Sequence, residues 1–130
     1  MAKQEQDWHS RKLWTILDIL GYKVPVYRAT HPDPTLCGEY NRKTVDIHLQ
    51  EDHRGDLFAE LDAFWHESLH AIEHIVLAPD DRMAERQVNA IALGQLNLLL
   101  NNPEVLEFLI KQLHELRKQQ QSKEITSDAS

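Results

Sequence analysis

Two histidines, His66 and His70, stand four residues apart and flank Glu67 in the segment His-Glu-Ser-Leu-His. On a helix, residues at this spacing project from one face about one turn apart, so both imidazoles can reach one zinc ion at about 2.0–2.1 Å. Glu67 is offset by about 100° around the helix axis, which lets its carboxylate reach a metal-bound water rather than the metal. In zinc peptidases with this spacing the ion acidifies the water and polarises the scissile carbonyl, while the glutamate transfers protons.

A catalytic zinc site needs a third protein ligand and one open position, and Glu85 is the best candidate for that ligand. Glu85 follows a turn at Pro79 and stands near the start of the next predicted helix, which can fold back antiparallel to the first. Asn89 lies one turn further on and could hydrogen-bond a ligand imidazole. Alternatively, Glu85 only complements the helix N-terminus, and spacing alone does not separate the two interpretations.

His74 is a poor third ligand, because the helix rises about 12 Å between His66 and His74. It is left as a second-shell residue or an exposed side chain. A peptidase usually adds a donor that stabilises the oxyanion, and the candidates for this role are Tyr40, His48 and His31. Each of these residue types is more often simply packed or exposed.

Helical periodicity extends over the second half of the chain. It predicts a helix from about Asp56 to about Leu77 and a second, capped by Asp80 or Asp81, that ends near Leu100. After Asn101-Asn102-Pro103, a last helix is predicted from Glu104 to about Arg117. The Gln- and Ser-rich residues 118–130 are predicted to be a disordered tail.

The first half contains other patterns. Helix-compatible apolar spacing followed by Gly21 predicts an amphipathic helix from Trp8 to Leu20. Val24–Tyr27 is predicted as a strand, at a sheet edge because of Pro25. Residues 36–40 and 44–49 are predicted to form a hairpin, with Val45, Ile47 and Leu49 on one face and Thr44, Asp46 and His48 on the other, as in a sheet packed on one face only.

Together these elements predict an α+β fold in a single domain, residues 1–117. The expected order is an N-terminal helix, a small antiparallel sheet of two to three strands and three further helices, with the metal site between the second and third helices of the chain. A chain of 130 residues is long enough for one such domain and one modest core.

Composition narrows the class of protein. Hydrophobic residues make up 42% and charged residues 27%, which is an ordinary globular balance. The net charge of −7 argues against a nucleic-acid partner. No apolar run approaches a membrane span or a secretory signal, and the single cysteine, Cys37, fits a reducing compartment, so a cytoplasmic location with no membrane partner is expected.

The two motifs in order resemble those of the ImmA/IrrE metallopeptidases of bacteria and their mobile elements. That family has a His-Glu-x-x-His helix, often with another histidine four residues on, and then a Glu-x-Glu-Ala-Asn-x-Phe-Ala-like segment. Here the corresponding segments are His66–His74 and Glu85-Arg-Gln-Val-Asn-Ala-Ile-Ala, and the resemblance covers about residues 44–100.

The resemblance implies a minimal gluzincin-like domain in which His66, His70 and Glu85 bind Zn2+ and Glu67 is the catalytic acid and base. It also implies a phage or mobile-element product that cleaves repressor-type transcription regulators. The departures are Gln87 and Val88 in place of the usual acidic residue and alanine, Ile91 in place of the aromatic residue, and a missing Leu-Met-Pro ending. They leave the metal site intact and weaken the transfer of substrate.

Three functions follow as hypotheses. The first is a zinc endopeptidase that acts on an intracellular protein or peptide substrate. The second is a metal-binding regulatory or interaction module without peptidase activity. The third is a helical interaction protein in which the His-Glu-x-x-His pattern is coincidental.

Overall fold

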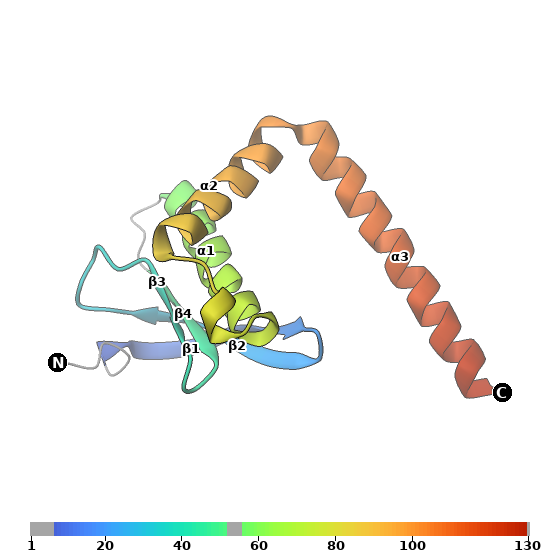
Figure 1. The fold of residues 1–130 in the computed structure, drawn as a ribbon, viewed down its shortest axis with the longest axis horizontal. Coiled ribbons are helices and arrows are strands. Elements are labelled where there is room, and N and C mark those ends of the chain that lie inside the picture. The colour runs from blue at the N-terminus through green and yellow to red at the C-terminus, as the bar shows by residue number, and fades with distance from the viewer. Residues whose placement is uncertain (1–6, 52–55, 130) are drawn as a thin grey trace. The chain divides into compact units, whose positions relative to one another are not determined.

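The computed structural model describes residues 7–51 and 56–129, and the chain divides into two compact units, residues 1–94 and 95–130. The first unit begins with a four-stranded sheet in the order β1-β2-β4-β3 (Figure 1). Its strands are β1 (His9–Ile19), β2 (Tyr22–Thr30), β3 (Gly38–Asn41) and β4 (Asp46–Gln50). β2 pairs antiparallel with β1 and parallel with β4, and β4 pairs antiparallel with β3, so the sheet is mixed.

The helices follow the sheet. They are α1 (Leu57–Val76), the short 3-10 helix η2 (Pro79–Asp81), α2 (Glu85–Asn101) and α3 (Pro103–Ala129). The class is therefore α+β. α3 extends beyond Arg117, where the sequence predicts the last helix to end. None of the helices in residues 7–51 and 56–129 combines the length and the apolar composition needed to cross a membrane.

The predicted N-terminal helix is wrong, because this segment is strand β1. β1 and β2 form a hairpin whose turn residues, Leu20 and Gly21, both have positive φ angles of 52° and 89°. The half-buried residues of β1 include Thr15, Leu17 and Ile19, which alternate as a strand requires. Gly21 therefore supplies a hairpin turn rather than a helix C-cap.

The predicted sheet of two to three strands is also wrong, because β1 is a strand and β4 joins β2 in parallel. Pro25 does not lie at the edge of the sheet, since β2 is interior. Its missing N–H is tolerated because β4 pairs with β2 only from Val26 onward, so Pro25 faces a partner, Ile16, in β1 alone.

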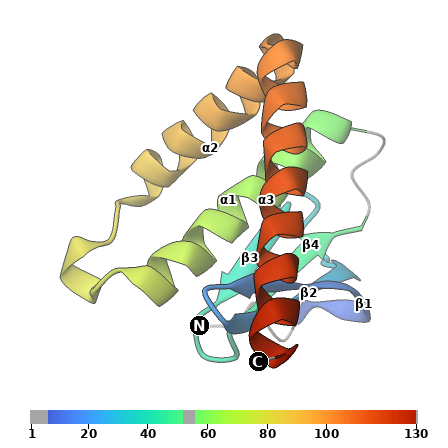
Figure 2. The ribbon, with the colours of Figure 1, turned by 90° about the vertical axis from the view of Figure 1, so that its right-hand side faces the viewer.

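α1 packs against β3 and β4 (Figure 2). The core between them consists of small helix residues and aliphatic strand residues: Val24, Val26, Ile47, Leu49, Ala63 and Ala71. The alanines allow the helix to approach the sheet closely, which fixes the height of α1 above the neighbouring strand β3.

Candidate metal centre

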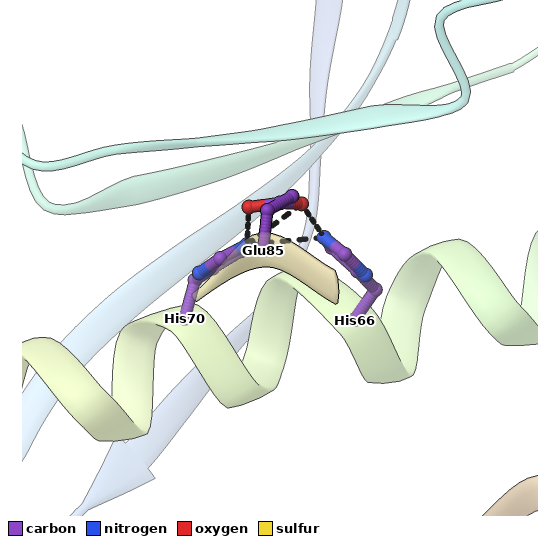
Figure 3. A group of neighbouring side chains, drawn as sticks. All are labelled: His66, His70 and Glu85. Atoms are coloured by element: carbon purple, nitrogen blue, oxygen red, sulfur yellow. Dashed lines mark hydrogen bonds and ion pairs between the residues drawn. The ribbon is translucent and has the colours of Figure 1, made fainter. Parts of the chain in front are cut away.

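Helix α1 presents both histidines of the motif on one side. Asp56 caps its N-terminus by accepting a hydrogen bond from the Ala59 backbone N–H at 3.0 Å, as the sequence predicts for Asp56 or a neighbour. The side of α1 that carries Ala63 and Ala71 is buried against the sheet. His66 and His70 remain half-buried, with their rings 4.7 Å apart, and point toward the start of α2 (Figure 3).

The structure brings His66, His70 and Glu85 together (Figure 3). The two Nε2 atoms lie 3.0 Å apart. The Glu85 carboxylate lies 2.5 Å from Nε2 of His66 and 3.1 Å from Nε2 of His70. One ligand atom from each residue falls within a group no wider than 4.8 Å, so this group can hold a metal ion.

The link between α1 and α2 sets the position of Glu85. Arg82 donates a hydrogen bond to the His74 carbonyl at 3.4 Å, and the Met83 backbone N–H donates to the Glu73 carboxylate at 2.6 Å. The side chain of Gln87 accepts from the Ala84 N–H at 2.8 Å and so closes the first turn of α2. Glu85 is thereby held as the first residue of α2, opposite the two imidazoles.

Glu73 is a residue beside the metal-binding group that the sequence interpretation missed. Its side chain is only 4% exposed, and its second oxygen lies 3.3 Å from Nδ1 of His70. A carboxylate in this place fixes the ring and the tautomer of a metal-binding histidine, leaving Nε2 free for the metal. The signal was present as the i,i+3 spacing of His70 and Glu73, which places both on one helix face.

Glu67 is buried, with 8% of its surface exposed, and its Oε2 lies 4.0 Å from Nε2 of His66. Burial, and then the negative charge of Glu85, raise the pKa of Glu67 to about 8, although a hydrogen bond from the Tyr40 backbone lowers it. A divalent cation in the group would lower this pKa, because it favours the ionised carboxylate. Without a cation in the group, Glu67 can therefore exchange protons near neutral pH.

Glu85 behaves differently. Burial alone would raise the pKa of this carboxyl group, but the charges and hydrogen bonds of His70 and His66 outweigh burial and lower the pKa. Glu85 is thus ionised at neutral pH, which a metal ligand requires. The two glutamates differ in protonation, one fit to bind a cation and the other to carry a proton.

A pocket of about 370 Å3 opens beside the group and is lined by residues that include His66, Glu67 and Glu85. Its opposite wall includes Gly38, at the start of β3. A Cβ atom at Gly38 would lie 3.2 Å from Cγ of Glu67 and 3.1 Å from Cδ2 of Leu49. The glycine therefore allows β3 and the Glu67 side chain to approach each other closely.

Asn89 and His74 are the two residues that the sequence places in the second shell of the metal site. Asn89 lines the pocket but forms no hydrogen bond with a ligand imidazole within residues 7–51 and 56–129. His74 accepts or donates at Nδ1 to the Tyr40 hydroxyl, 2.6 Å away. The Tyr40 side chain is thus already paired with His74, while its backbone contacts Glu67.

His31 and His48, the other two predicted oxyanion donors, lie away from the metal-binding group. His48 alternates along β4 with Ile47 and Leu49, which face α1, so its ring lies on the opposite face of the sheet. There it stacks between Trp8 and Tyr27, with ring centres 5.4 Å away on each side. His31 meets the same Trp8 edge-on at 4.8 Å.

The prediction that the sheet is packed on one face only is also wrong, because the second face of β4 is buried as well. Asp46, His48 and Gln50 are buried rather than exposed, and the His48 ring lies against Trp8 and Tyr27. Both faces of β4 are therefore buried, one against α1 and the other, at His48, against Trp8.

The chain was compared with protein-family models, with curated proteins and with solved structures, and no match was found in any of the three.

Proposed function

We propose that the chain is a zinc-dependent endopeptidase that hydrolyses a peptide bond of an intracellular protein, and that it is related to the ImmA/IrrE metallopeptidases it resembles. The observation that carries the proposal is the buried Glu67 carboxyl group, 4.0 Å from a histidine that forms a metal-binding group with His70 and Glu85. A purely structural metal site does not require a buried carboxyl group beside its ligands, whereas a hydrolytic site requires one as acid and base.

The donor set fits zinc. Two imidazole nitrogens and one carboxylate, beside an open pocket, match the ligands of catalytic zinc in peptidases. When bound there, zinc would acidify a water molecule and polarise the substrate carbonyl.

The chain's own residues supply the proton transfers. Glu67 accepts a proton from the attacking water as the water oxygen bonds to the carbonyl carbon. When the C–N bond breaks, Glu67 delivers that proton to the leaving amine. Burial raises the pKa of Glu67 and so makes its carboxylate a stronger base toward the water, whereas a bound cation would lower this pKa again.

Strand β3 offers a place for the substrate backbone. β3 is an edge strand, since it pairs with β4 on one side and with no other strand of residues 7–51 and 56–129. It also packs beside α1, next to the pocket. An extended peptide that adds to this edge would pass the metal-binding group with its carbonyl groups held in register.

The test is a comparison of wild type with Glu67→Gln, each purified without a polyhistidine tag. Both proteins are expected to bind about one zinc per chain, and Glu67→Gln should lose at least about a hundredfold in peptide hydrolysis. Undiminished activity in Glu67→Gln would overturn the role of this residue. Tight zinc binding without hydrolysis in the wild type would favour the second candidate, a metal-binding interaction module.

A further inference from the structure

The pocket beside the metal-binding group has two chemically different parts. Its volume of about 370 Å3 falls within the usual range for ligand pockets. Small and apolar residues form one part of its walls, and they come from the start of β3 with the residues before it and from the first half of α1: Leu36, Cys37, Gly38, Ala59 and Ala63. A carboxylate, Asp62, interrupts this apolar surface.

Asp62 differs from the other carboxylates of the pocket in its contacts. Within residues 7–51 and 56–129 it forms no hydrogen bond or ion pair, in contrast to Glu67 and Glu85, which are engaged at the metal-binding group. The described lining contains neither lysine nor arginine. No lysine or arginine of the lining therefore compensates the charge of Asp62.

The negative potential of the carboxylates also reaches Cys37, another residue of the lining. The pKa of the Cys37 thiol is raised, by burial first and then by the carboxylates of Asp56, Asp62 and Glu67. A group that enters between Cys37 and α1 thus meets a negative potential on one side and apolar surface on the other.

The position of Asp62 along α1 determines how long a side chain must be to reach it. Asp62 precedes His66 by four residues, so it lies about 6 Å along the helix from the first metal-binding histidine, on the same face. A side chain next to the scissile bond can contact Asp62 only if it is long. It also needs an aliphatic stem for the apolar wall and a cation at its end, and lysine and arginine combine these features.

We propose that this pocket binds a lysine or arginine side chain of the substrate next to the scissile bond, and that Asp62 selects it. This proposal rests on the proposed function, because it assumes a polypeptide substrate that is cleaved at the metal-binding group. It goes further in assigning a specificity residue and a substrate class, a basic segment of a polypeptide.

The experiment measures preference in binding and in cleavage separately. The zinc-loaded full chain is titrated with hydroxamate-capped peptides that are identical except for one side chain, which is lysine, norleucine or glutamate and is placed on either side of the zinc-binding group. Matched fluorogenic peptides are assayed for kcat/KM. At one of the two positions, lysine should exceed norleucine by about fivefold or more, and glutamate should be weakest.

Two variants test the residue. Asp62→Asn should reduce the lysine-to-norleucine ratio to about one without changing norleucine binding, and Asp62→Lys should reverse the preference toward glutamate. Asp80→Asn, which removes an exposed charge outside the pocket, should change nothing. The lysine preference of the wild type should fall as salt is added.

The outcomes separate the two proposals. Cleavage without a side-chain preference, or a preference that survives Asp62→Asn, overturns this inference and leaves the proposed function standing. A lysine preference in hydroxamate binding without any cleavage supports the pocket assignment and overturns the peptidase. Failure of the chain to bind zinc and any hydroxamate overturns both.

Discussion

Glu73 gives the sharpest prediction about how the metal-binding group is held. One oxygen of its buried carboxylate faces Nδ1 of His70 at 3.3 Å, and the other accepts the Met83 N–H at 2.6 Å. The substitution Glu73→Gln keeps the shape of the side chain but leaves a single acceptor oxygen, because the second position becomes an NH2 donor. Glutamine can therefore satisfy His70 or Met83, but not both.

The magnitude depends on which partner is lost. If the amide faces His70, the imidazole loses its orienting acceptor and zinc affinity should fall by about tenfold to a hundredfold, or about 1.4–2.8 kcal/mol. If the amide faces Met83 instead, a buried N–H loses its acceptor and the free energy of unfolding should fall by about 1–3 kcal/mol. Only the second case loosens the link that carries Glu85, because the Met83 N–H keeps its acceptor in the first.

The assay pairs a zinc titration against a chromophoric chelator with urea unfolding of the metal-free chain. Asp80→Asn is the matched control, since it removes a carboxylate of the same link that is exposed. The control should match the wild type in both measurements. If Glu73→Gln also matches it in both zinc affinity and unfolding free energy, Glu73 does not hold the group together and the reasoning fails.

Three further predictions concern stability and the approach of β3. Burial lowers the pKa of His48, with Arg11 assisting and Asp46 opposing, so the unfolded chain binds a proton at this histidine more readily than the folded chain. The free energy of unfolding in urea should therefore fall as the pH drops below about 6.5, by at most about 1.4 kcal/mol per pH unit, and His48→Phe should flatten that decline. Gly38→Ala should displace Glu67, which should lower the free energy of unfolding by about 1–3 kcal/mol and reduce cleavage more than zinc affinity. In the control Gly94→Ala the added Cβ meets nothing within 4 Å, so this change should stabilise α2. Equal effects of the two substitutions would contradict the close approach of β3 to Glu67. Zinc at 100 times its Kd should raise the unfolding free energy by about 2.7 kcal/mol, and a zinc-independent midpoint would argue against the site.

Local signals were sufficient for the starts of α1 and α3 but not for that of α2, because Asp80 and Asp81, predicted to cap this helix, lie in η2 and α2 begins at Glu85. Asp56 caps α1 and Pro103 begins α3, and both positions could be predicted because capping and the first-turn preference of proline depend on neighbouring residues only. The spacing of His66 and His70 likewise determines their common face once a helix is assumed.

The N-terminal segment could not be predicted because its pattern satisfies two periods. Leu13, Trp14 and Ile16 fit a helical stripe, yet all three are about half exposed in β1, which is held by pairing with β2 rather than by burial of those side chains. A hairpin depends on a partner strand, and the turn residues that specify it, Leu20 and Gly21, also resemble a helix C-terminus.

Long-range contacts account for the other errors. His48 was predicted to be on a solvent-facing side because its strand alternates, but Trp8, 40 positions earlier in the chain, covers that face. The contact of Glu73 with Met83 forms only because the link after α1 folds back. Neither contact is encoded in the local pattern.

The most direct test of the zinc site is X-ray absorption at the zinc edge on tag-free protein loaded with one equivalent of zinc. We expect two imidazole nitrogens at about 2.0–2.1 Å and a carboxylate oxygen at about 2.0–2.2 Å, with the carboxylate contribution lost in Glu85→Ala. A spectrum without imidazole ligands, or one that Glu85→Ala leaves unchanged, would contradict binding by His66, His70 and Glu85.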